Sequence, residues 1–156
     1  MSKRAKLTLE ELKKAEPLPH FWDENWEVED PTILAWVINN ADKWKPRRVE
    51  SKGRWIEPIE HNGFKYLGAI WLPDGKIYLA DTEAFSIMSL ANGERTASDI
   101  IYELISTAIE ELPKEDELRK AVESGNIDEK TQKLLDGLFA LYYRHLAMLK
   151  EKRLIN

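Results

Sequence analysis

The chain lacks cysteine altogether, and this absence excludes disulfide bonds, thiolate catalysis and zinc sites built on cysteine. Long hydrophobic runs are also missing, because no stretch reaches the roughly 18 apolar residues that a membrane-spanning helix needs. The N-terminal residues 1–6 are basic, but no apolar segment of the signal-peptide kind follows them. We therefore expect a cytoplasmic protein with no membrane partner.

Glutamine occurs only once, at Gln132, whereas charged residues make up 33% of the chain. Many Lys and Glu together with few thermolabile residues are typical of thermophile proteins. The formal net charge is −5, and a protein whose main task is to hold phosphate backbones is usually basic. The composition therefore favours a partner other than nucleic acid.

Residues suited to catalysis are scattered along the chain. The histidines His20, His61 and His145 are far apart, and none has a second histidine at the spacing of a helical metal site. We expect His61 and His145 to lie on the surface. The seven glycines form no phosphate-binding loop. The sequence thus predicts a non-enzymatic protein with no catalytic residues, no metal site and no cofactor.

The middle of the chain has the pattern of a three-stranded antiparallel meander. Strands are predicted over residues 54–60, 64–72 and 76–80, separated by Asn-Gly and Pro-Asp-Gly turns. Pro58 marks the first strand as an edge strand, because proline cannot donate a ladder hydrogen bond. Such a sheet leaves an edge that another segment must cover or pair with.

A helix-turn-helix follows the third strand. The first helix is predicted over residues 82–90 and ends at Asn92-Gly93, and the second over 97–112 begins at Thr96, a capping residue. A last helix is predicted over 128–152 by apolar residues that recur at three- and four-residue steps. Together with the meander, this order predicts an α+β fold with a winged-helix core of three strands and three helices.

The first half of the chain is rich in tryptophan. Asp30-Pro31 predicts the start of a helix over residues 31–43. We expect residues 1–53 to form a Trp-rich helical elaboration on a winged-helix domain over 54–156, which carries a charged insertion at about 113–127. The tryptophans suit either a packed layer or an aromatic binding groove, and the large apolar area that each ring buries favours packing. They are Trp22, Trp26, Trp36, Trp44, Trp55 and Trp71.

A basic cluster surrounds Trp44 and Trp55. Basic residues interleaved with aromatic ones can bind nucleic acid through phosphate contacts and base stacking, or an acidic peptide. A solvated loop that balances the acidic remainder is the plain alternative. The cluster consists of Lys43, Lys45, Arg47, Arg48, Lys52 and Arg54.

The step from Asn92 to Ile100, with the meander before it, resembles the PqqD-like domains, the recognition elements of ribosomal-peptide modification pathways. The matching residues are Leu79, Ala84, Ile87, Leu90, Gly93, Thr96, Asp99, Ile100 and Leu104. The resemblance covers about residues 55–110 and 128–152. It does not extend to the Trp-rich layer or the charged insertion, either of which could cover the sheet edge.

The resemblance implies that the chain binds the leader of a precursor peptide and works with a modifying enzyme, often a radical S-adenosylmethionine enzyme. The leader would add as a strand to the third strand of the sheet and lie against the last helix, a known mode of peptide recognition. The implied contact residues are Lys76, Ile77, Tyr78, Leu79, Ala80, Leu138, Tyr142, Arg144 and Leu146.

Two other functions stay open from the sequence. A winged-helix regulator would bind nucleic acid through the basic cluster and through a helix that exposes Lys or Arg. A homodimer would pair the last helix with its own copy through Leu138, Leu141 and Leu149. The sequence favours the peptide- or protein-binding function over both.

Overall fold

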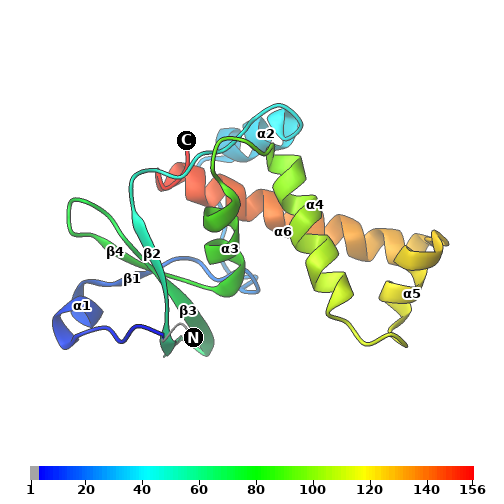
Figure 1. The fold of residues 1–156 in the computed structure, drawn as a ribbon. Helices are drawn as coiled ribbons and strands as arrows, with labels where there is room; N and C mark the ends of the chain where they lie inside the picture. Colours follow the sequence, from blue (N-terminus) through cyan, green and yellow to red (C-terminus); the bar gives the residue numbers. More distant parts are fainter. Residues whose placement is uncertain (1–3) are drawn as a thin grey trace.

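The computed structural model describes residues 4–156 and shows an α+β fold with six helices and a four-stranded mixed sheet (Figure 1). The strand order is β1-β4-β3-β2, so β1 and β2 are the edges. In chain order the elements are α1 (Leu9–Lys14), β1 (Glu16–Pro17), α2 (Pro31–Asn40), β2 (Lys52–His61), β3 (Phe64–Trp71), β4 (Ile77–Ala80), α3 (Thr82–Leu90), α4 (Ala97–Glu110), α5 (Glu117–Ser124) and α6 (Glu129–Glu151).

The predicted meander is confirmed. Strands β2 and β3 pair antiparallel from Lys52 opposite Trp71 to His61 opposite Phe64, and β3 pairs antiparallel with β4. The β2–β3 turn has positive φ at both Asn62 and Gly63, which is the conformation that Asn-Gly favours in a two-residue hairpin. A register shift between Trp55 and Ile59 brackets Pro58, as expected for a proline in an edge strand.

The three-stranded sheet expected from the sequence is wrong in its strand number, because β1 adds a fourth strand. Glu16 pairs with Tyr78 and Pro17 with Leu79, in parallel with β4. A strand of two residues that includes a proline carries no periodic signal. Its position is instead explained by the next residue, Leu18, whose side chain is fully buried.

The helix starts predicted at Asp30-Pro31 and Thr96 are confirmed, and other helices also begin at capping residues. Thr8 and Glu11 form a capping box on α1, and Thr96 and Asp99 form one on α4. Asp30 caps α2, which has Pro31 at its first turn, and Asp128 caps α6. These caps satisfy N–H groups that the first turn of a helix leaves without partners.

Helix α6 is buried along only part of its length. Its C-terminal half supplies fully buried core residues such as Leu146 and Leu149, whereas Leu134 near its start is 52% exposed. Figure 1 shows why, because α4, α5 and the first half of α6 extend away from the sheet as a helical projection. Of the helices within residues 4–156, none has the combined length and apolarity needed to cross a membrane.

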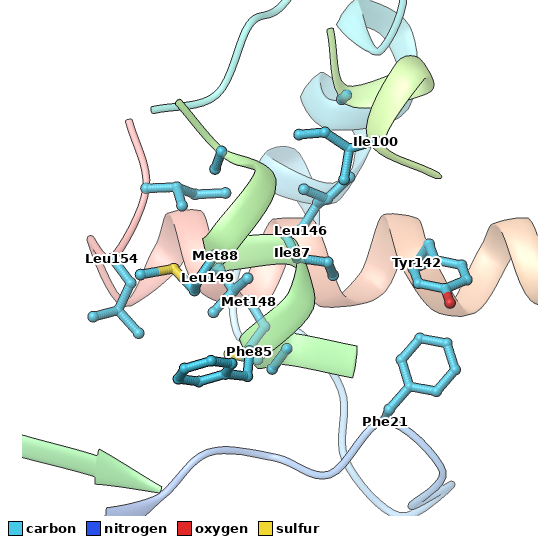
Figure 2. Close-up of a cluster of buried hydrophobic side chains, with 14 of the residues drawn as sticks. Phe21, Phe85, Ile87, Met88, Ile100, Tyr142, Leu146, Met148, Leu149 and Leu154 are labelled. Atoms are coloured by element: carbon cyan, nitrogen blue, oxygen red, sulfur yellow. The ribbon is translucent and has the colours of Figure 1, made fainter. Parts of the chain in front are cut away.

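The main core joins residues from both sides of the boundary that we predicted at residue 53. Leu18, Phe21 and Val37 belong to the same buried cluster as the side chains of α3 and α6. Figure 2 shows Phe21 facing Tyr142 of α6, with Phe85, Ile87 and Met88 of α3 packed nearby. Leu18, Phe21 and Val37 therefore contribute to the same core as the helices of the C-terminal part.

Candidate functional site

The outer edge of β4 is occupied by an N-terminal arm, defined here as residues 16–26. After β1, the Leu18 N–H donates a 2.8 Å hydrogen bond to the Leu79 carbonyl oxygen, which extends the pairing. The Tyr66 hydroxyl donates to the Leu18 carbonyl oxygen at 2.9 Å. The expectation of an open edge on this strand is therefore wrong.

The arm is anchored on α6 by Arg144. The Arg144 guanidinium donates hydrogen bonds to the carbonyl oxygens of Phe21, Asp23 and Trp26, and it lies 4.0 Å from the centroid of the Trp26 ring. Phe21 is 1% exposed and packs 4.8 Å from the Tyr142 ring. Removing such a ring from water typically contributes about 1.5–3 kcal/mol, so the arm is part of the folded core.

The arm thus fills the place where the resemblance puts a leader peptide. Tyr78, Leu79 and Ala80 are buried in β4, which lies between β3 and β1. Leu146 of α6 is also fully buried. Among the residues expected there, Ile77 is also buried, Leu138 is half-buried, and Lys76 is exposed just before β4. Apart from Lys76, these side chains belong to the core or pack against it.

His145 lies in the interior, so the expectation of a surface position is wrong; His61, by contrast, is exposed as expected. The ring of His145 lies between those of Phe21 and Trp26, with centroid distances of 5.1 and 5.5 Å. Its Nε2 is 3.5 Å from Oδ2 of Asp81, too long for a strong hydrogen bond. Apolar residues before and after His145 on the buried side of α6 were the signal for this position.

Asp81 links the arm to α3. Its carboxylate accepts hydrogen bonds from the Phe21 N–H at 2.7 Å and from the Ala84 N–H at 2.8 Å, so it also caps α3. Burial by itself favours the neutral acid, but His145 and these two N–H groups outweigh it and hold the pKa of Asp81 below its usual value. This role is not visible in the sequence, because a cap is a local signal whereas the bond to Phe21 spans 60 residues.

A second carboxylate of α3 lies beside this link. Glu83 accepts a 2.7 Å hydrogen bond from the Tyr142 hydroxyl, and burial raises the pKa of Glu83. Burial, with the neighbouring Glu83 charge, also raises the pKa of Tyr142. The polar groups of these residues therefore pair locally. Glu83 pairs with Tyr142, and Asp81 pairs with the backbone N–H groups of Phe21 and Ala84.

The opposite edge of the sheet has a cavity beside it. The cavity has a volume of about 490 Å³ and lies between β2 and α3. We call it the β2 groove, and it is lined by Arg48, Ser51, Lys52, Gly53, Arg54, Trp55, Ile70, Phe85, Met88 and Ser89. Three of these residues carry positive charge and none carries negative charge. A second cavity of about 380 Å³ shares Arg48 and Ser51 with it.

Two glycines allow the floor of the β2 groove to form. A Cβ atom on Gly68 would lie 2.4 Å from Cδ2 of Phe85, and one on Gly53 would lie 3.1 Å from its Cε2. The missing side chains let the Phe85 ring lie against the sheet, with the Trp55 ring 4.4 Å from it. Trp55 remains 42% exposed, so its ring presents an apolar face to the groove.

The six residues of the predicted basic cluster are all exposed. Only Arg48, Lys52 and Arg54 line the β2 groove. The Arg48 guanidinium donates to the carbonyl oxygens of Met88 and Ser89 at the C-terminal end of α3, where positive charge is favoured. Arg47 packs over Gly93, and neither Lys43 nor Lys45 lines the groove. The structure therefore brings half of the cluster to one site.

Some of the tryptophans pack against the hydrophobic clusters, and others are exposed. Trp26 and Trp44 pack against the main core and Trp71 against a smaller cluster on the other face of the sheet. Trp22 and Trp36 are exposed at 56% and 40%, away from the β2 groove. Both interpretations thus hold in part: Trp26 and Trp44 pack, while Trp55 lines the β2 groove.

The second helix of the helix-turn-helix carries no positive charge. Helix α4 contains no Lys or Arg, and its exposed residues include Asp99, Glu103 and Glu110. Such a helix is poorly suited to the major groove of DNA, where phosphates lie on both sides. The proposed dimer face on α6 is also incomplete, because Leu149 is buried in the core.

Comparisons with known proteins give no match: no family model, no curated protein and no solved structure is similar to this chain. The groove and the arm are therefore interpreted from their own geometry.

Proposed function

We propose that this chain is a non-enzymatic binding module that takes an extended peptide segment by strand addition along β2, in the β2 groove. The observation that carries the proposal is an edge strand with an apolar floor beside it. A strand edge supplies main-chain hydrogen bonds, and pockets beside it receive alternate side chains. The groove residues Trp55, Phe85 and Met88 supply the apolar contacts.

A short segment of the chain already pairs with this edge. The Ala5 N–H donates to the Trp55 carbonyl oxygen, and the Glu57 N–H donates to the Ala5 carbonyl oxygen, both at 2.9 Å. Ala5 pairs in parallel with Ile56. This pairing supports the proposal, because it is an example of an extended segment that pairs with the outer edge of β2.

The resemblance to recognition elements adds a biological setting to the proposal. The bound segment would be the leader of a precursor peptide, presented to a modifying enzyme such as one of the radical S-adenosylmethionine type. The site would differ from the one that the resemblance implies, because the arm already fills the β4 edge.

Selection of peptides from a displayed random library tests the proposal. The selected peptides are expected to lose at least about fivefold in affinity for Trp55→Ala, since a buried aromatic contact is typically worth more than about 1 kcal/mol. Trp22→Ala is the matched control, because Trp22 is similarly exposed but lies outside the groove. Peptides that bind both variants alike would contradict the β2 site.

Nucleic acid is the alternative outcome of the same test. The exposed cluster that includes Lys43 and Arg47 favours it, whereas the acidic surface of α4 opposes it. Binding of an oligonucleotide that weakens steeply as salt rises would support the regulator instead, because phosphate contacts release counterions.

A further inference from the structure

We propose that the peptide taken by β2 alternates apolar with acidic residues along its length. This inference rests on the proposed function, since it specifies the ligand of the same edge. It follows from a difference between the two faces of β2 in the stretch from Lys52 to Trp55.

One face of this stretch is apolar and turns toward α3. Gly53 and Trp55 both contact Phe85, as shown by the 3.1 Å approach at Gly53 and the 4.4 Å ring separation at Trp55. Ile70, which pairs with Gly53 across the sheet, continues the same surface. A ligand side chain on this face would meet Trp55, Phe85 and Met88.

The other face of the same stretch is cationic. Lys52 and Arg54 alternate with Gly53 and Trp55, so both border the groove along the strand edge while their Cβ atoms point to the opposite face of the sheet. Both residues are exposed, and within residues 4–156 neither has a carboxylate within the 4.0 Å of an ion pair. In a ligand strand paired with β2, the Cβ atoms of every second residue would lie about 4.5–5.5 Å from those of Lys52 and Arg54.

The main-chain groups of this stretch determine how the ligand pairs. The hydrogen bonds of Ala5 show that the C=O of Trp55 and the N–H of Glu57 point away from β3. By the same alternation, the N–H and C=O of Gly53 and the N–H of Trp55 point to the outer edge. Within residues 4–156 no backbone group pairs with them.

These three features together select the ligand. Its backbone would pair with Gly53 and Trp55, its apolar side chains would enter the groove, and its acidic side chains would meet Lys52 and Arg54. A one-residue shift would exchange the two sets of side chains, so the register is specified strongly. A sugar-phosphate backbone lacks this two-sided alternation, and the lining of the groove therefore favours a peptide.

The test uses fluorescein-labelled, end-blocked synthetic peptides and fluorescence anisotropy with the full chain. One peptide alternates glutamate and valine, a second has the same residues in two blocks, and a third alternates lysine and valine. We expect the first to bind at least about tenfold more tightly than either of the others, because only it matches both faces. Equal affinity for the alternating and block peptides would overturn the inference.

A charge-reversed variant makes the test reciprocal. Lys52→Glu combined with Arg54→Glu is expected to prefer the lysine–valine peptide over the glutamate–valine peptide, while a Trp55→Ala chain weakens the binding of both. An unchanged preference in the charge-reversed variant would also overturn the inference.

The experiment distinguishes a wrong residue pattern in the peptide from a wrong binding site on the protein. Binding that depends on Trp55 but not on the order of residues would overturn the alternation and leave the proposed function standing. No binding by any of the three peptides, or binding only of an oligothymidylate, would overturn both.

Discussion

The two long edges of the sheet differ in how they are covered. The β4 edge carries the N-terminal arm, in which Leu18 and Phe21 are almost completely buried. On the β2 edge, the one pairing residue within residues 4–156 is Ala5, beside the groove floored by Phe85. An unpaired edge invites association with another chain, and proteins usually cover or charge it. Here one edge is covered by the core, and the other combines positive charge with a cavity.

The difference shows which edge is available to a ligand. To free β4, a ligand would have to displace two buried side chains, the hydrogen bond to Asp81 and the three carbonyl contacts of Arg144. Among residues 4–156, no segment pairs with Gly53 on the outer side of β2, so a ligand there would displace none of these residues. Strand addition at β2 therefore costs less free energy than strand addition at β4.

The largest effect is expected from removing the anchor of the covered edge. Phe21→Ala should lower the free energy of unfolding by about 3–5 kcal/mol, as is usual when a buried phenyl ring is lost. Urea unfolding measures this change. Trp22→Ala, which removes a ring that is 56% exposed, is the control and should change it by less than about 1 kcal/mol. Similar losses for the two variants would show that the arm is not held by Phe21.

The next effect is expected at Asp81, which connects the arm to α3. Asp81→Asn should lower the free energy of unfolding near pH 7 by about 1–3 kcal/mol, because charged hydrogen bonds to two backbone N–H groups are weakened. The exposed Asp74 accepts a comparable bond from the Lys76 N–H, and Asp74→Asn is the control with a smaller change.

The contribution of Asp81 should also depend on pH. Its pKa is lower in the folded chain than the unfolded value of about 3.9, so the ionised carboxylate stabilises the fold above that value. This contribution is lost as the pH falls through the folded pKa. Urea titrations from pH 7 to 3 should therefore show the difference between the original chain and Asp81→Asn narrowing at low pH. A constant difference would contradict this role.

Local signals predicted much of the fold, because caps, turns and apolar periodicity act within a few residues. Thr96 with Asp99 and Asn62 with Gly63 are examples where the structure confirms the expected geometry. The arm was not predicted, since β1 has two residues and its pairing with Tyr78 depends on contacts across the chain. Apolar residues flank His145 on α6, but the rings of Phe21 and Trp26 that cover it come from the arm, so the sequence prediction placed it wrongly on the surface.

The candidate site was predictable in its chemistry but not in its location. The basic cluster and Trp55 were visible in the sequence, and three of those cations do line the β2 groove. Its apolar floor comes from Phe85 and Met88 on α3, which periodicity identifies only as buried helix residues. That Gly53 and Gly68 both lie under Phe85 depends on the tertiary packing of α3 on the sheet.

A substitution at Gly68 tests whether this glycine shapes the floor of the β2 groove. Gly68→Ala should lower the free energy of unfolding by about 1–3 kcal/mol, because the new Cβ would overlap the Phe85 ring and overpack the site. The displaced ring would also narrow the groove, so peptide affinity should fall together with stability. Urea unfolding and peptide binding on the same sample measure the two effects.

The smallest effect is expected from a glycine-to-alanine substitution at a position where the new Cβ atom meets no neighbouring atom. Gly137 lies on an exposed position of α6, and a Cβ there would meet nothing within 4 Å. Gly137→Ala should raise the free energy of unfolding by about 0.5–1 kcal/mol, because alanine favours a helix interior over glycine by that amount. Opposite signs for Gly68→Ala and Gly137→Ala would show that the loss at Gly68 comes from contact with Phe85. A loss at both positions would instead attribute the effect to the backbone, and would remove the evidence that Gly68 shapes the groove.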